Sequence, residues 1–197
     1  MRKAKKTKKI DNSSKILLIV ENSEVDFFRL YFNQYIKDNY DISIKCESSG
    51  INNKCEITNY DKMNKRIKRA IEKEDFKAVF LMLDLNTKCA KTQNNHICLI
   101  ELKEEYLPRY KIKKELQDRF YLFVVCNEIE SWFLTIDKDT NNPYQDHKKE
   151  LKKFLNVDSE PKIVQKMIKE LKSGRYKLDF SKNKSLKYFI EKLKQNI

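Results

Sequence analysis

The chain has 197 residues, of which 40% are hydrophobic and 11% aromatic, and it carries a formal net charge of +13. This length and apolar content predict one domain around one core. No window holds the roughly 18 apolar residues of a membrane span, and the N-terminus has no apolar signal stretch, so we expect a cytoplasmic protein without a membrane partner. Five cysteines without a CxxC pair and only two histidines argue against a disulfide scaffold or a zinc ribbon.

Basic residues are concentrated at the N-terminus. The segment RKAKKTKK, residues 2–9, contains six basic residues and no acid, so residues 1–14 are predicted to form a basic disordered arm and residues 15–197 a single domain. Outside this segment, 36 basic residues remain against 29 acidic ones. A basic domain favours a polyanion such as nucleic acid as its partner. The alternative is that lysine is simply the common surface residue of a chain rich in Lys, Asn and Ile.

The first predicted unit is a strand followed by a helix. Residues 15–21 hold a continuous apolar run that is typical of a strand buried on both faces, and the run ends at Glu21. A helix is predicted next, with Ser23 as its N-cap. Its apolar residues fall on one face at helical spacing: Val25, Phe28, Phe32, Tyr35 and Ile36.

The same order is repeated further along the chain. Residues 41–50 alternate between apolar and polar side chains, which predicts a second strand. Apolar residues at helical spacing over residues 60–71 predict a helix whose N-cap lies near Asp61. Residues 78–86 then form another continuous apolar run that contains a carboxylate near its end, Asp84.

The second half begins with a polar stretch, NTKCAKTQNNH, that has no period and predicts a long loop. A charged helix is predicted over residues 100–119, with an interruption near Pro108. Residues 120–127 give a further buried strand, FYLFVVCN. Helical spacing of apolar residues over 163–171 and 186–193 predicts helices in the last part of the chain.

Alternating strands and helices with such continuous apolar runs predict an α/β fold: a mainly parallel sheet with helices on both faces and a C-terminal helical extension. In such sheets ligands bind outside the carboxyl ends of the strands. Acidic and amide side chains stand at these ends, and we expect them to converge where the strands are neighbours: Glu21, Asp84, Asn86, and Glu128 or Glu130. For each residue taken alone, a solvated strand end is the simpler interpretation.

Converging carboxylates indicate a divalent cation. Carboxylates within a few ångströms of one another repel unless a cation neutralises them, and oxygen ligands suit Mg²⁺ or Mn²⁺. Such an ion polarises a phosphodiester and lowers the pKa of a bound water. With basic surroundings to hold a phosphate backbone, the sequence predicts metal-dependent hydrolysis of nucleic acid, either DNA or RNA.

Four short motifs, in this order over about residues 15–193, resemble those of TOPRIM domains, and in particular the RloB-like family and related TOPRIM proteins of unknown function. V-E-N-S-E-V-D-F-F resembles the family's opening, with Glu21 and Glu24 on its two acidic positions. The other three motifs resemble the family's D-x-D, its E-x-W-L-L and its C-terminal P-K followed by Y-x-K. They are Asp84-Leu85-Asn86, Glu130-Ser131-Trp132-Phe133-Leu134, and Pro161-Lys162 with Tyr176-Lys177.

The resemblance implies a TOPRIM-like fold and a Mg²⁺- or Mn²⁺-dependent nuclease with a role in bacterial or archaeal antiviral defence and an ATPase as partner. It also implies site roles. The implied catalytic residues are Glu21, Asp84, Glu130 and Lys177, and the implied metal ligands are Glu21, Asp84 and Asn86.

The sequence departs from the TOPRIM pattern at two positions. Asn22 stands in place of the usual Gly, and Asn is the residue that best tolerates the backbone conformations of Gly. Asn86 stands in place of the second Asp, which removes a negative charge from the metal site. Its carbonyl can still serve as a neutral ligand.

Several residues keep two interpretations. Glu24 aids the metal or complements the dipole of the helix that follows it. Glu128 is the alternative to Glu130 as the acidic residue that completes the site after the strand at residues 120–127. Trp132 packs in the core or stacks on a base. Lys162 and Lys177 stabilise charge on a phosphate or are solvated surface lysines.

The function also has two alternatives. Because Asn86 removes a charge, the chain can be a non-catalytic nucleic-acid-binding or interaction module that has kept the fold. The weaker alternative is a flavodoxin-like regulator phosphorylated on Asp84, for which the sequence lacks a clear arrangement of Lys and Ser or Thr after the later strands.

Overall fold

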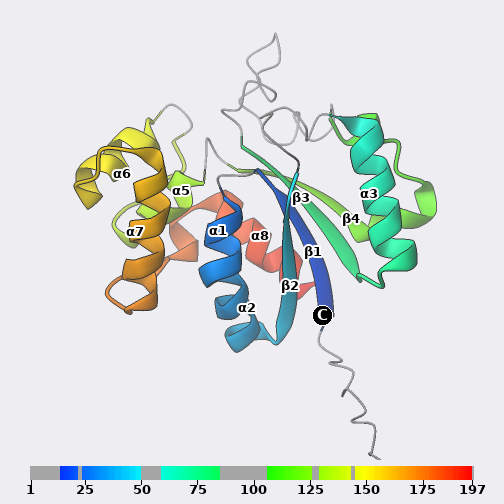
Figure 1. The fold of residues 1–197 in the computed structure, drawn as a ribbon, viewed down its shortest axis with the longest axis horizontal. Coiled ribbons are helices and arrows are strands. Elements are labelled where there is room, and N and C mark those ends of the chain that lie inside the picture. The colour runs from blue at the N-terminus through cyan, green and yellow to red at the C-terminus, as the bar shows by residue number, and fades with distance from the viewer. Residues whose placement is uncertain are drawn as a thin grey trace, which may run out of the picture.

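The computed structural model describes residues 14–21, 24–49, 59–84, 106–125, 129–142 and 145–196. At its centre is a four-stranded sheet in which each strand is parallel to its neighbours, in the order β2-β1-β3-β4 (Figure 1). The strands are β1 (Ser14–Val20), β2 (Ile42–Ser48), β3 (Ala78–Asp84) and β4 (Phe120–Val125). The predicted α/β fold with a parallel sheet is confirmed.

Burial on both faces explains the continuous apolar runs of the strands. Side chains alternate between the two faces of a sheet along each strand. In β1, Ile16 and Leu18 belong to the core on one face, Leu17 and Ile19 belong to the core on the other, and all four are at most 1% exposed. The edge strand β2 alternates instead between buried and more exposed residues, as its sequence predicts.

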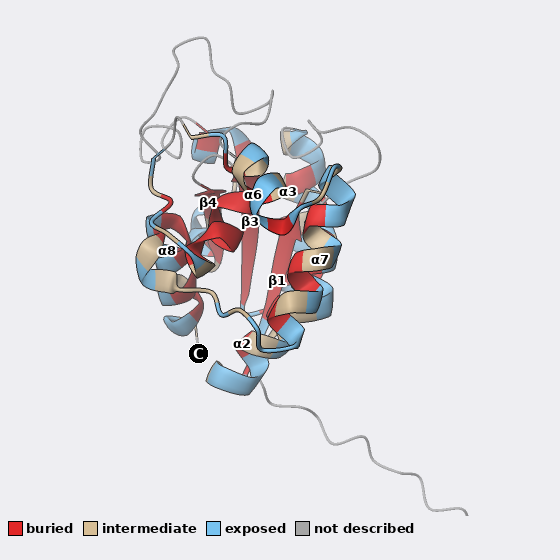
Figure 2. Ribbon diagram, turned by 90° about the vertical axis from the view of Figure 1, so that its left-hand side faces the viewer, coloured by how far each residue is buried: buried red, intermediate tan, exposed pale blue. Residues whose placement is uncertain are grey.

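The larger core lies on the face covered by the first helical segment and the C-terminal helices, whose inner sides are buried (Figure 2). The ring centroid of Phe189 lies 5.1 Å from that of Phe123, 5.4 Å from that of Trp132 and 5.8 Å from that of Phe80. The first segment consists of α1 (Val25–Phe27), the π-helix η1 (Phe28–Phe32) and α2 (Asn33–Tyr40).

The C-terminal part confirms the predicted helical extension. It contains α5 (Glu130–Phe133), η5 (Leu134–Ile136), α6 (His147–Leu155), α7 (Glu160–Lys172), η6 (Phe180–Lys182) and α8 (Lys184–Lys194). The sequence does not predict α6, because only Leu151 and Leu155 mark an apolar face in a run of charged residues. Within the described ranges, no helix is both long enough and apolar enough to cross a membrane.

The smaller core lies on the opposite face, under α3 (Tyr60–Lys73) and two 3-10 helices, η3 (Leu107–Tyr110) and η4 (Lys114–Arg119). The N-cap of α3 is Asn59, whose side chain accepts a hydrogen bond from the backbone N–H of Lys62. The cap predicted near Asp61 therefore lies two residues earlier. With helices over both faces, the layer order predicted from the sequence is confirmed.

The charged helix predicted over residues 100–119 is wrong in its described part. The chain forms η3 and η4 instead, and Lys111 in the link between them is left-handed, with φ +49°. Such a conformation costs a non-glycine residue about 1–2 kcal/mol and ends a helix. The side chain of Asn64 on α3 holds the link, because its Nδ2 donates to the carbonyl oxygens of Tyr110 at 2.6 Å and Lys111 at 2.9 Å.

Ion pairs join the edge strand β2 to α3. The guanidinium of Arg66 lies 2.9 Å from Glu47 and 3.0 Å from Glu74, and the Lys45 ammonium lies 2.8 Å from Glu47. Burial by itself would raise the pKa of Glu47, but hydrogen bonds and charges from Lys45 and Arg66 together hold this pKa below its ordinary value. The charged form of Glu47 is therefore the one that the folded protein favours.

We expect this group to make the stability depend on pH in the acid range. Because folding lowers the pKa of Glu47, its contribution is present above the unfolded-state pKa of about 4.3 and is lost as the pH falls through the folded-state value. Urea unfolding at descending pH should therefore show a smaller loss of stability for Glu47→Gln than for the wild type. Glu72→Gln, an exposed carboxylate on α3, is the control and should behave as the wild type. An identical pH dependence for Glu47→Gln would contradict this expectation.

Candidate functional site

The direction in which strands are added to the sheet reverses between β1 and β3. From β1 the chain moves to β2 on one side and then to β3 on the other, with its helices on opposite faces. In open α/β sheets, such a reversal between neighbouring strands leaves room for a ligand outside their carboxyl ends. We call the edge where all four strands end the carboxyl edge.

The strand register makes Glu21 and Asp84 neighbours at the carboxyl edge. The ladder between β1 and β3 pairs Ile19 with Leu81, and continuing it sets Glu21 beside Leu83, one residue before Asp84. If the spacings of a regular parallel sheet continued to Glu21, the α-carbons of Glu21 and Asp84 would be about 6 Å apart, and their side chains would start from opposite faces of the sheet. A shared ion would then lie beyond the strand ends. Glu21 is partly exposed, with its Oε1 atom buried.

Two other predicted positions at this edge, Asn86 and Glu128, lie outside the described residues, and the side chain of Asp84 does too. The structure therefore gives the backbone frame of the predicted site and one of its three predicted metal ligands with a side chain, Glu21. Among the described side chains, no group of three or more His, Cys, Asp or Glu is arranged to hold a metal ion. The described side chains include Glu21 but neither of its predicted partners.

Glu24 lies inside the protein next to Glu21. The backbone N–H of Glu24 donates to the carbonyl oxygen of Glu21 at 3.1 Å, and Glu24 is only 1% exposed. Glu24 also affects Cys46 on β2. The pKa of the Cys46 thiol is raised to about 12, mainly by burial. The charges of Glu24 and Glu47 contribute to this rise, and the charge of Arg29 opposes it. Glu24 would therefore act from a buried position, whether it aids the metal or complements the dipole of the helix that follows it.

Glu130 is the first residue of α5 and is 5% exposed. Helix α5 packs against α1, with the rings of Phe133 and Phe27 at a centroid distance of 4.7 Å. Glu130 precedes Phe133 by three residues, and Glu24 precedes Phe27 by three. Each of the two buried carboxylates therefore lies about one helical turn before a ring of this contact.

Lys148 on α6 is a neighbour of this group that the sequence does not predict. Its Nζ atom lies 4.0 Å from Oε1 of Glu130 and 3.7 Å from Oε2 of Glu160. The run HKKELKKFL contains four lysines, and nothing in the sequence distinguishes this one from the others. Only the packing of α6 on α5 identifies it.

The remaining predicted residues lie elsewhere. Trp132 is in the core, 1% exposed, and its Nε1 donates to Oγ of Ser185 at 2.9 Å, so the core interpretation of Trp132 is confirmed. Lys162 is exposed and pairs with Asp158 at 2.8 Å. Lys177 is exposed between α7 and η6. In the part of the chain with placed side chains, no ion pair joins either lysine to the carboxylates of the carboxyl edge.

No protein-family model matches this sequence, and no curated protein or solved structure is significantly similar to it. The TOPRIM family therefore stays a prediction. What the chain does has to be inferred from the carboxyl edge itself.

Proposed function

We propose that this protein binds nucleic acid and hydrolyses its phosphodiester bonds with a divalent cation held at the carboxyl edge between β1 and β3. The observation that supports the proposal is the strand order, which sets the carboxyl ends of β1 and β3 side by side at the point where ligands bind in such sheets. The net charge of +13 supports a polyanionic substrate. The resemblance of the motifs to TOPRIM proteins supports the same site.

The donor set fits Mg²⁺ or Mn²⁺. Glu21 and Asp84 offer carboxylate oxygens and Asn86 an amide oxygen, and these are the ligands that both ions prefer. A bound ion would supply positive charge beside the phosphodiester and a more acidic water.

The other residues of the proposed site have roles around this centre. Glu130 is proposed to accept or return a proton at the carboxyl edge, with its carboxylate positioned by the ammonium of Lys148 at 4.0 Å. Lys177 is proposed to contact the phosphate from the protein surface. A cytoplasmic location, an ATPase partner and a role in defence belong to the same proposal; they follow from the sequence and the resemblance alone.

Calorimetric titration with Mn²⁺ and Mg²⁺ tests the metal site. We expect the wild type to bind one ion and Asp84→Ala to lose this binding, because two of the three proposed ligands are carboxylates and the remaining carboxylate binds weakly alone. Asp38→Ala is the control: it removes an exposed aspartate near the C-terminus of α2, at the opposite edge of the sheet, and should bind as the wild type does. Absence of binding by the wild type up to millimolar ion would contradict the enzyme and favour the non-catalytic module.

A further inference from the structure

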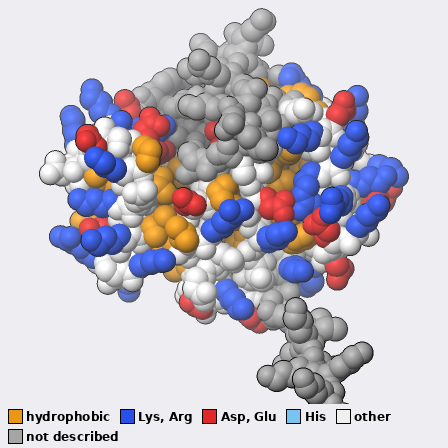
Figure 3. All heavy atoms as spheres, viewed as in Figure 1, with side chains coloured by type: hydrophobic (Ala, Val, Ile, Leu, Met, Phe, Trp, Pro, Cys, Tyr) orange, Lys and Arg blue, Asp and Glu red, His pale blue; other side chains and the backbone are white. Residues whose placement is uncertain are grey.

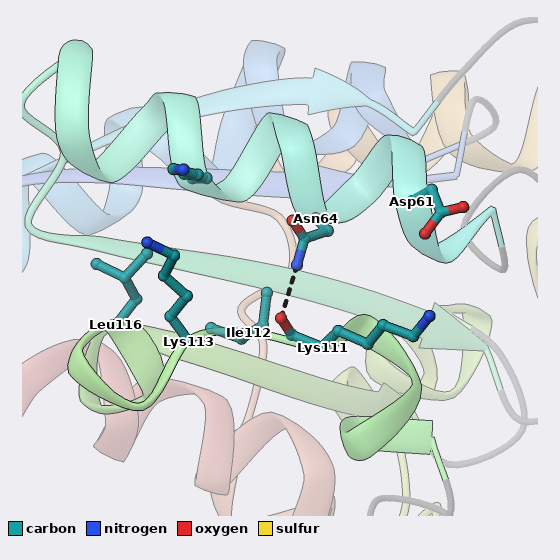
Figure 4. A pocket seen from close by; sticks show the side chains of 7 residues that line it. Asp61, Asn64, Lys111, Ile112, Lys113 and Leu116 are labelled. Carbon is teal, nitrogen blue, oxygen red and sulfur yellow. Dashed lines mark hydrogen bonds between the residues drawn. The ribbon is translucent and has the colours of Figure 1, made fainter.

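A hollow of about 230 Å³ lies between α3 and the link from η3 to η4 (Figure 4). Lysines line it from both sides, Lys68 from α3 and Lys111 and Lys113 from the link, with Asp61 at the N-terminal end of α3. Pockets that enclose small-molecule ligands have about 300–1,000 Å³. This hollow is smaller, which favours one anionic group of a larger ligand over a whole small molecule.

The positive charges of the hollow are not balanced by the described residues around it. Lys68 and Lys111 form no ion pair with any described residue, and Lys113 lies 3.6 Å from Glu115, a pair that is more than half exposed on both sides and therefore weak. Among the described residues that line the hollow, Asp61 is the one carboxylate. Figure 4 shows the side chain of Lys111 extending toward Asp61 and that of Lys113 on the other side of Asn64, so an anion bound in the hollow would supply counter-charge to lysines on both sides of Asn64.

Hydrogen bonds from α3 hold the backbone of the link between η3 and η4, which carries Lys111 and Lys113. Lys111 keeps its left-handed conformation while the amide of Asn64 binds the carbonyl oxygens of Tyr110 and Lys111. In Figure 4 the Asn64 side chain spans from α3 to the link, between Lys111 and the part of the hollow that contains Lys113. The separation between the two walls is therefore fixed by hydrogen bonds within the protein.

The cations continue from the hollow toward the carboxyl edge. Helix α3 runs antiparallel to the strands, so its N-terminus lies at this edge. There the exposed guanidinium of Arg109 lies 4.9 Å from the ring centroid of Tyr106 and 6.0 Å from that of Tyr60. Tyr60 and Lys68 are about 12 Å apart along the helix axis, a length that spans three to four phosphates of one strand.

We propose that the hollow between α3 and the η3–η4 link binds backbone phosphates of the nucleic acid, as a second contact outside the cleavage site. This inference rests on the proposed function. Lysine ammonium groups bind phosphate as point charges without a required orientation, which suits a backbone contact that reads no sequence. The line of cations leading to the carboxyl edge favours a continuous nucleic acid over an acidic peptide.

The test is the salt dependence of binding to labelled single strands and duplexes, measured by fluorescence anisotropy in EDTA so that no cleavage occurs. In the triple variant Lys68→Gln, Lys111→Gln, Lys113→Gln, we expect the slope of log K against log salt to become shallower. The expected change is about 2 for single strands and about 2.7 for duplexes, corresponding to three lost phosphate contacts.

Basic side chains also cover the surface over α6 and α7, across the molecule from α3 (Figure 3). The matched control therefore replaces three exposed lysines there: Lys149→Gln, Lys153→Gln, Lys172→Gln. It changes the net charge equally and should leave the slope unchanged. Equal losses in both triple variants, or none in the first, would overturn the hollow as a contact and leave the proposed function standing. Wild-type protein that binds no nucleic acid would overturn both, and competition by polyglutamate as strong as that by nucleic acid would identify an acidic peptide as the ligand.

Discussion

Replacing Glu21 with glutamine is expected to reduce Mn²⁺-dependent cleavage by about 100-fold or more, the effect of removing a positioned acid–base group. Glutamine keeps the shape of the side chain but has no negative charge, so it is a weaker ligand for a divalent ion and cannot take up a proton. The measurement is the rate of product formation from plasmid DNA, single-stranded DNA and total RNA, each incubated with purified protein and Mn²⁺.

The control for this experiment is Glu72→Gln, which removes the same charge from the exposed face of α3. It should cleave at the rate of the wild type. If Glu21→Gln were as active as the wild type on the substrate that is cut, Glu21 would have no catalytic role. Because binding is measured separately in EDTA, a loss of cleavage can be assigned to the chemical step.

Replacing Trp132 with alanine is expected to lower the free energy of unfolding by about 3–5 kcal/mol. The indole is 1% exposed, its centroid lies 5.4 Å from that of Phe189 and 6.3 Å from that of Phe28, and its Nε1 donates to Ser185. The substitution leaves a cavity between α5, η1 and α8. Urea denaturation followed by circular dichroism measures the loss.

Trp132→Phe separates the two contributions of this side chain. It keeps an aromatic ring in the cluster but removes the hydrogen bond, and we expect a loss of about 1–3 kcal/mol. Ser185 keeps its own bond, because its hydroxyl donates to Oδ1 of Asn183 at 2.7 Å. A cost of Trp132→Ala below that of Trp132→Phe would show that the ring does not pack as the structure has it.

The strands could be predicted because short apolar runs in the sequence indicate where a strand is buried. A strand covered on both faces needs apolar side chains at nearly every position, and β1, β3 and β4 have them, apart from Ser14 and Lys15 at the start of β1 and Asp84 at the end of β3. The edge strand β2 shows the alternation of a strand with one better-covered side. A parallel sheet with covering helices follows from these patterns and from the helices between them.

The region before β4 could not be predicted because a distant contact decides its conformation. Residues 114–119 are charged and suited to a helix, but Asn64, 47 residues before Lys111, binds the carbonyl oxygens of the link. The sequence does not predict the π-helix η1 either, because Phe28 and Phe32 fit the period of an ordinary α-helix. In the region before β4 a tertiary contact overrides a local pattern.

The candidate site, like the fold, could be predicted only in part from the sequence. That Glu21 and Asp84 end strands can be inferred from the sequence, but their adjacency depends on the order β2-β1-β3-β4, which no local pattern contains. The contact of Glu130 with Lys148 depends on the packing of α6 against α5 and could not be predicted at all. Strand ends indicate where a ligand binds, and only the fold indicates which of them are neighbours.

Phe189 of α8 completes the aromatic cluster on one face of the sheet. Its partners Phe80 in β3 and Phe123 in β4 come earlier in the chain. On a ribosome that adds about 5–20 residues per second, Phe189 is made about 3–13 s after the end of β4. Throughout that interval the nascent chain has all four strands but lacks the helix that covers this face. Translation thus passes through a stage with an uncovered aromatic surface, the kind of surface that chaperones bind.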